Sequence, residues 1–198
     1  MDEAHPGSGD WVFVDVGFSQ NKSCGILEPD GRLDCLSFAG ARQRLAELAV
    51  DSDAPLNLVL EAPLSACFSS DGNPVGRSIE RRGAQTRYWH TGIACSVFIS
   101  AAYMLRAMLE RNGTRDIRLF EGFVSFKEKG VKSDHRLDVG RLRDVVWRVP
   151  GTGRIVPPDA LRSPNAARVA STFEVCGLDL GVPPVILVEA QDMVVAGQ

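Results

Sequence analysis

Acidic residues stand at or beside the ends of several apolar segments of the sequence. Asp15 interrupts the apolar run 11–16, Glu61 ends the run that begins at residue 56, and Asp134 and Asp138 lie in an amphipathic segment. Carboxylates at the margin of a core are costly unless hydrogen bonds or cations compensate them. Mg²⁺ and Mn²⁺ prefer carboxylate oxygens, and two such ions about 4 Å apart activate a water and stabilise the leaving oxygen of a phosphodiester. The acids therefore predict a magnesium- or manganese-dependent site for phosphodiester hydrolysis.

Each acid also has a purely local explanation. Asp15 can start a turn, Glu61 can end a strand, and Asp134 can cap a helix. The order of the acids along the chain favours the metal hypothesis. Asp15 stands at the end of the first predicted strand, Glu61 stands on the strand that follows the first predicted helix, and the last acids lie together on a later helix. Asp134 and Asp138 are four residues apart and His135 and Asp138 three apart, so either pair can share a helix face. His135 or Asp134 is expected as a fourth contributor beside Asp15, Glu61 and Asp138.

The elements that must position these acids follow from the apolar periodicity. Strands are expected at 11–16, 22–29, 32–38, 56–64 and 117–126, helices at 41–50, 91–113, 133–149 and 163–177, and a strand or extended tail at 182–190. This order predicts an α/β domain with a mixed sheet, in which three antiparallel strands precede parallel ones and helices cover both faces. A hairpin turn centred on Asp30 and Gly31 would place Cys24 opposite Leu36 or Ser37.

Length and composition indicate one globular domain. The chain has 198 residues, of which 44% are hydrophobic and 24% charged. We expect a flexible leader at 1–10, a single domain at 11–190 with a polar insertion at 65–91 and a C-terminal extension at 150–190, and a tail at 191–198. The five cysteines lack CxxC spacing and no apolar run has the length of a bilayer span, so a cytoplasmic protein with reduced thiols and no membrane partner is expected. A net charge of -3 argues against coating of DNA by bulk electrostatics, although a local basic site remains compatible.

Basic and aromatic residues gather in two polar segments. A polar segment in which basic and aromatic residues are interleaved suits a surface that follows a nucleic-acid backbone and stacks on bases. The predicted nucleic-acid-binding residues are Arg77, Arg81, Arg82, Arg87, Trp89, Lys127, Lys129 and Lys132. The alternative for the arginine-rich segment is a solvated loop with Trp89 packed under the next helix. The alternative for the lysines is an ordinary charged loop around Glu128.

Glu121 lies within the predicted strand 117–126. It can point into the same cleft as a supporting ligand, or orient Lys127 or Lys129. An acid on the solvent face of an edge strand is an equally open interpretation.

Three short motifs resemble those of the ribonuclease H-like superfamily. "FVDVG" is similar to its first-strand aspartate motif, "VLEAP" to its fourth-strand acid, and "SDHRLDVGRL" to the acidic helix of the Holliday-junction-resolvase (RuvC-like) branch. The chain also resembles a branch of predicted nucleases through "LFEGFVSFK". The resemblance covers about residues 11–147. It implies a single RNase H-like domain, Mg²⁺ or Mn²⁺ as cofactor, nuclease activity on DNA or RNA, and work as a homodimer or in a larger complex. Val139-Gly140 departs from the small residue that commonly follows the helix acid.

Two other function classes stay open. One is a non-catalytic RNase H-like scaffold or accessory subunit that binds protein or nucleic acid. The other is an ATP- or phosphate-binding protein of actin-like ancestry, which shows a similar D-x-G after its first strand, although this chain is short for that two-lobed architecture. An enzyme with a covalent nucleophile is disfavoured, because no histidine stands in a recognisable pattern with a serine or cysteine.

Overall fold

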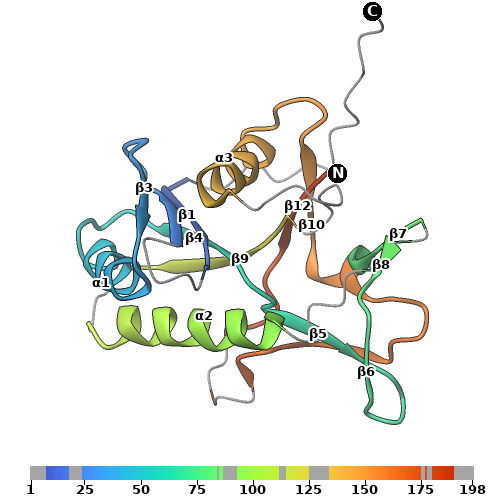
Figure 1. The fold of residues 1–198 in the computed structure, drawn as a ribbon. Coiled ribbons are helices and arrows are strands. Elements are labelled where there is room, and N and C mark those ends of the chain that lie inside the picture. Colours follow the sequence, from blue (N-terminus) through green and yellow to red (C-terminus); the bar gives the residue numbers. More distant parts are fainter. Residues whose placement is uncertain are drawn as a thin grey trace, which may run out of the picture.

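The computed structural model describes residues 8–17, 24–83, 85–86, 93–111, 115–124, 134–174, 177 and 180–189. Most of the expected leader and the whole expected tail lie outside these ranges. The main sheet has seven strands in the order β10-β12-β9-β4-β1-β2-β3 (Figure 1). In chain order these are β1 (Asp10–Asp15), β2 (Cys24–Leu27), β3 (Leu33–Leu36), β4 (Leu56–Glu61), β9 (Ile117–Phe123), β10 (Gly153–Val156) and β12 (Val185–Val188).

Strand directions confirm the expected α/β fold with a mixed sheet. β1 pairs antiparallel with β2, and β2 pairs antiparallel with β3. β4 is parallel to β1, β9 is parallel to β4, and β12 is parallel to β9. The β2–β3 hairpin turns at Gly31, whose φ of 86° suits a residue without a side chain, and it pairs Cys24 with Leu36 as the turn chemistry predicts.

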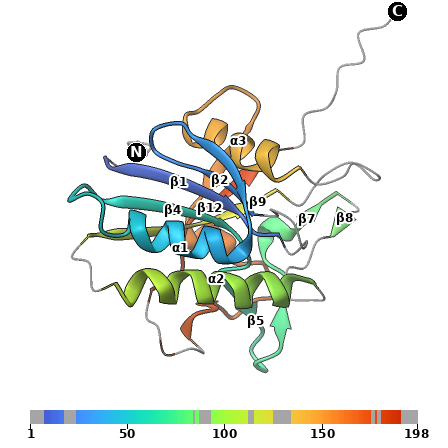
Figure 2. The ribbon, with the colours of Figure 1, turned by 60° about the vertical axis from the view of Figure 1, so that its left-hand side comes forward.

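Helices cover both faces of the sheet. α1 (Phe38–Leu48) and α2 (Ile93–Leu109) lie on one face, and α3 (His135–Val146) lies on the other, as two views show (Figures 1 and 2). Successive side chains of a strand point to opposite faces. Val12, Val14, Leu58 and Leu60 therefore join the core under α1 and α2, whereas Trp11, Phe13 and Val59 join the core under α3.

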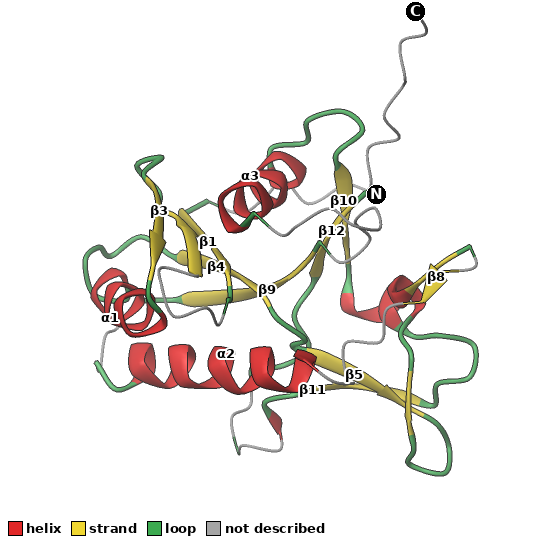
Figure 3. Ribbon diagram, in the orientation of Figure 1, coloured by secondary structure: helices red, strands yellow, loops and turns green. Residues whose placement is uncertain are grey.

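The polar insertion has more regular structure than its sequence pattern indicates. It contains β5 (Ser65–Phe68), β6 (Pro74–Val75), a 3-10 turn (Ser78–Glu80), β7 (Arg81–Arg82) and β8 (Gln85–Thr86). β5 pairs with β6 and with β11 (Arg168–Ser171), which comes from the C-terminal extension. Figure 3 shows β5 and β11 side by side below the main sheet.

One expectation for the C-terminal extension is wrong, and the expected strand at its end is confirmed. The expected helix 163–177 does not form: its described residues are turns and the strand β11, whose backbone is satisfied by pairing with β5. The segment expected as a strand or extended tail is β12, which lies inside the sheet between β9 and β10. A further 3-10 turn (Pro158–Leu161) links β10 to β11.

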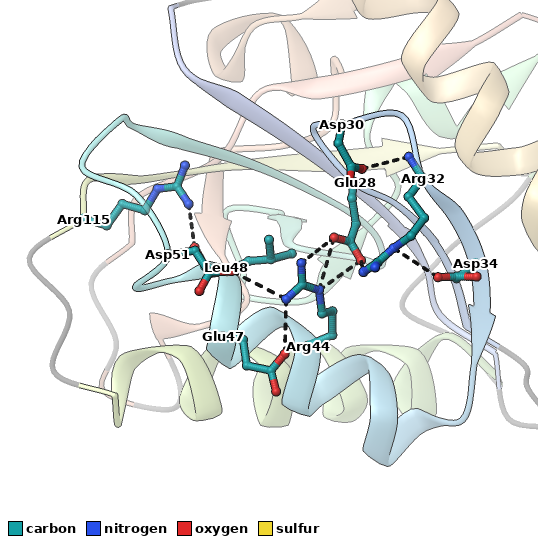
Figure 4. A network of polar contacts seen from close by, with 9 residues as sticks. All are labelled: Glu28, Asp30, Arg32, Asp34, Arg44, Glu47, Leu48, Asp51 and Arg115. Carbon is teal, nitrogen blue, oxygen red and sulfur yellow. Dashed lines mark hydrogen bonds and ion pairs between the residues drawn. The ribbon is translucent and has the colours of Figure 1, made fainter.

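The hairpin at the edge of the sheet is attached to α1 by a cluster of charges (Figure 4). Arg44 Nη2 donates to Glu28 Oε2 at 2.7 Å, and Arg44 Nε donates to Glu28 Oε1 at 3.0 Å. Arg32 also binds the Glu28 carboxylate, whose side chain is buried. Burial alone would raise the pKa of Glu28, but the hydrogen bonds and charges of Arg44 and Arg32 outweigh it and lower that pKa. Glu28 is therefore a structural ion at neutral pH.

Among the described residues, no helix has the length and apolar character needed to cross a membrane.

Candidate metal centre

Three carboxylates converge above the sheet on the side covered by α3. Asp15 ends β1, Glu61 ends β4, and Asp138 lies in the first turn of α3. One oxygen from each carboxylate lies within 4.8 Å of one from each of the others. The sequence-based prediction that these three acids meet at one point is confirmed.

Strand register brings the first two acids together. β1 and β4 are parallel neighbours, and Asp15 is the direct partner of Glu61. Alternate residues of a strand point to the same face, so Asp15 points with Trp11 and Phe13, and Glu61 points with Val59. Both acid side chains therefore leave the sheet on the α3 side. Two apolar strands that are neighbours in the sheet and each end in an acid therefore supply two of the three carboxylates.

Helix α3 supplies the third acid because it packs against the sheet directly over two glycines. Gly25 on β2 faces the start of α3, and a Cβ at that position would lie 2.2 Å from the backbone oxygen of His135. Gly122 on β9 faces Leu142, and a Cβ there would lie 2.8 Å from its side chain. The absence of side chains at Gly25 and Gly122 lets the apolar face of α3 approach until Asp138 reaches the strand acids.

Two of the acids are buried and have polar partners, whereas Glu61 is partly exposed. Asp15 is 4% exposed and Asp138 is 1% exposed. His135 Nδ1 lies 2.7 Å from Asp15 Oδ2, and Arg141 Nη1 lies 3.2 Å from Asp138 Oδ1. His135 thus contacts one of the acids and stands outside the carboxylate cluster itself. Its expected catalytic role stays a prediction.

The residues present fit a hard divalent cation. All three converging donors are carboxylate oxygens, which Mg²⁺, Mn²⁺ and Ca²⁺ prefer, whereas zinc and copper favour histidine and cysteine. Three negative charges this close together repel one another strongly in a partly buried environment. A divalent cation between them would relieve that repulsion.

Asp134, expected as a ligand, is used differently. Its carboxylate accepts hydrogen bonds from the backbone N–H groups of Arg136 and Leu137, which makes it the N-cap of α3. It is exposed and is not a member of the carboxylate cluster. Asp134 positions the helix that carries Asp138.

Glu121 lies on the other face of the sheet from the cluster. It is the register partner of Leu60, which points toward α1 and α2. The residue of β9 next to Glu61 on the α3 side is Gly122, whose own Cβ position would be 3.4 Å from the Cα of Glu61. The expectation of a supporting ligand at Glu121, or of a carboxylate at a solvent-exposed edge, is therefore corrected, because β9 is an interior strand and Glu121 is fully buried.

Arg77 is the partner of Glu121, which contradicts its expected role in nucleic-acid binding. Its Nη1 donates to Glu121 Oε2 and to Ser65 Oγ, both at 2.7 Å, and its Nε donates to Glu80 Oε1 at 3.0 Å. The backbone N–H of Leu64 donates to Glu121 Oε2 at 2.9 Å. Burial acts to lower the pKa of Arg77, but the two carboxylates outweigh it and raise that pKa, so the guanidinium stays charged. A buried arginine that is paired with two carboxylates anchors the insertion to β9 and is not accessible to a phosphate backbone.

The other predicted nucleic-acid-binding residues divide into two groups. Arg81 and Arg82 are exposed on β7, so they are accessible, and their role stays a prediction. The remaining five lie outside the described residues: Arg87, Trp89, Lys127, Lys129 and Lys132.

Sequence reasoning missed Arg141, Gly25 and Gly122. Arg141 could have been found, because it follows Asp138 by three residues on a predicted helix and the two side chains must be neighbours. The glycines gave no such signal, since only the packing of α3 on the sheet reveals what a Cβ would meet.

Comparisons of the chain with protein-family models, with curated proteins and with solved structures found no match.

Proposed function

We propose that this protein is a divalent-metal-dependent nuclease with an RNase H-like domain. The observation that carries the proposal is the convergence of Asp15, Glu61 and Asp138 from β1, β4 and α3. The order of the main-sheet strands and α-helices from β1 to α3 supports it, because three strands, a helix, a strand, a helix, a strand and a helix is the order that the sequence resemblance implies once the insertion strands β5–β8 are set aside.

Each residue of the cluster has a defined part in the proposed reaction. Asp15, Glu61 and Asp138 would hold Mg²⁺ or Mn²⁺ through their carboxylate oxygens. His135 orients Asp15 through the contact between Nδ1 and Oδ2. When bound, the metal supplies a water activated for attack and positive charge that stabilises the phosphate in the transition state. Placement of the ligands on two strands and a packed helix keeps them in a fixed geometry.

Cleavage assays test this proposal directly. End-labelled single-stranded, duplex and four-way-junction DNA, with RNA counterparts, would be incubated with the protein and Mn²⁺ or Mg²⁺. We expect cleavage of at least one form by the wild type, and its loss in both Asp15→Asn and Asp138→Asn. Asp134→Asn is the matched control, because asparagine also caps a helix and the residue lies outside the cluster. Cleavage that persists in both cluster variants contradicts the proposal.

One observation favours the second candidate function, a non-catalytic accessory subunit with the same fold. Two basic side chains, His135 and Arg141, already contact Asp15 and Asp138. In an accessory protein these contacts would occupy the acids permanently. Metal binding distinguishes the two functions, because the accessory subunit needs none.

A further inference from the structure

Arg141 stands where the buried acid cluster meets solvent. It follows Asp138 by one turn of α3, and its Nη1 lies 3.2 Å from Asp138 Oδ1. The Asp138 side chain is 1% exposed, whereas the Arg141 side chain is 47% exposed. Within the described part of the chain, Asp138 is the one ion-pair partner recorded for this guanidinium. Arg141 therefore links a buried candidate ligand to the surface.

Arg141 offsets part of the cost of burying the Asp138 carboxylate. The gain in stability is limited, because the guanidinium is half-exposed, water screens its charge and the long side chain loses rotamer freedom. Elsewhere the chain shows what a structural arginine looks like, since Arg77 is buried and bound by two carboxylates and a hydroxyl. Among the described residues Arg141 has one side-chain contact, with Asp138, and its side chain is 47% exposed.

A divalent cation and Arg141 compete for the same carboxylate. A cation held by Asp138 would repel the guanidinium at short range. A guanidinium displaced from Asp138 stays at the rim of the cluster, because the helix fixes its Cα. Its planar fork of N–H donors matches the oxygens of a phosphate and can bind two of them at once.

We propose that Arg141 binds the substrate phosphate at this site, and that its guanidinium exchanges Asp138 for a phosphate oxygen when the metal is held by the acids. This inference rests on the proposed nuclease function and names the residue that positions the phosphate. The exchange keeps the guanidinium paired with an anion in both arrangements.

Two variants of the same helix test the exchange. Arg141→Gln removes the charge and keeps an amide that can still donate to Asp138. Arg143→Gln is the control, because Arg143 is 50% exposed, is paired with Asp144 at 2.8 Å and makes no recorded contact with the acid cluster. Mn²⁺ affinity, measured by calorimetry, should rise by about three- to tenfold in Arg141→Gln, because a like charge within a few ångströms of the ion is removed. It should not change in Arg143→Gln.

Phosphate binding is measured on the Mn²⁺-loaded proteins with inorganic phosphate as the probe. Paramagnetic Mn²⁺ shortens the ³¹P relaxation time of a phosphate held next to it, so no turnover is needed. We expect strong relaxation enhancement with the wild type and with Arg143→Gln, a loss of at least about fivefold in phosphate affinity with Arg141→Gln, and partial recovery with Arg141→Lys, which restores the charge without the fork.

Three outcomes overturn the inference, and they differ in what else they affect. Equal phosphate binding by Arg141→Gln and wild type overturns the role of Arg141 and leaves the metal site intact. Weaker Mn²⁺ binding by Arg141→Gln overturns the exchange, because Arg141 would then only hold Asp138 in place. Absence of Mn²⁺ binding by the wild type overturns the proposed function and this inference together.

Discussion

Replacement of Gly25 by alanine tests whether the close approach of α3 to β2 builds the acid cluster. A Cβ at this position would lie 2.2 Å from the backbone oxygen of His135, whereas real Cβ contacts are essentially never shorter than 3.0 Å. The helix start or the strand must therefore move by at least 0.8 Å, the difference between these two values. Metal–ligand distances tolerate only about 0.2 Å. A shift of this size at the start of α3 separates Asp138 from Asp15.

We expect Gly25→Ala to lower Mn²⁺ affinity by at least about tenfold, since displaced ligands behave like ligands that have lost their supporting contacts. The overpacked contact should also lower the free energy of unfolding by about 1–3 kcal/mol. Calorimetric titration with Mn²⁺ measures the first effect, and urea unfolding monitored by circular dichroism measures the second.

Gly140→Ala is the matched control for this substitution. It makes the same chemical change within α3, where the added Cβ would meet no side chain and no backbone outside its own stretch of helix within 4 Å. Removal of a glycine from a helix interior should stabilise the protein by about 0.5–1 kcal/mol without an effect on Mn²⁺ affinity. The reasoning is refuted if Gly25→Ala binds Mn²⁺ as tightly as the wild type, or if Gly140→Ala weakens binding to the same extent.

Two further substitutions test the roles assigned to acids outside the cluster. Glu121→Gln should lower the free energy of unfolding by about 3 kcal/mol, because it leaves the buried Arg77 without the full charge of one partner. Mn²⁺ affinity should not change. A large loss of Mn²⁺ binding would show that Glu121 supports the metal after all. Glu28→Gln should cost about 1–3 kcal/mol at pH 7 through its lost charge-assisted hydrogen bonds. Because the folded-state pKa of Glu28 is lowered, that contribution is present above its unfolded pKa of about 4.3 and is lost as the pH falls through the folded value. The stability difference between wild type and Glu28→Gln should therefore stay constant from pH 7 to about 5 and shrink below about pH 4 in urea titrations; a constant difference down to pH 3 would contradict the assigned role.

The parts of the fold that follow local rules were predictable from the sequence. The turn at Gly31 sets the register of the β2–β3 hairpin, and the pairing of Cys24 with Leu36 follows from it. Asp134 is a strong cap signal, and the α3 stripe that it precedes forms a helix as expected. Asp15 and Glu61 each end a short apolar strand, and parallel pairing of those strands was sufficient to bring the two acids together.

The remaining features depend on contacts between distant segments. β12 is short and follows two prolines, and only its pairing with β9 and β10 places it inside the sheet. β11 pairs with β5 across about half the chain, and this pairing outweighs a weak helical pattern. Glu121 could not be assigned to a face from its own segment, because β9 carries apolar residues on both faces and only the partner Leu60 identifies the face.

Mn²⁺ titration of the wild type beside Asp15→Asn, Asp138→Asn and Asp134→Asn tests the central claim most directly. The account predicts that the wild type binds Mn²⁺, that Asp15→Asn and Asp138→Asn lose this binding, and that Asp134→Asn keeps it, because an asparagine still caps α3. Absence of Mn²⁺ binding by the wild type, or unchanged binding by both cluster variants, would contradict the claim that these carboxylates form a metal centre.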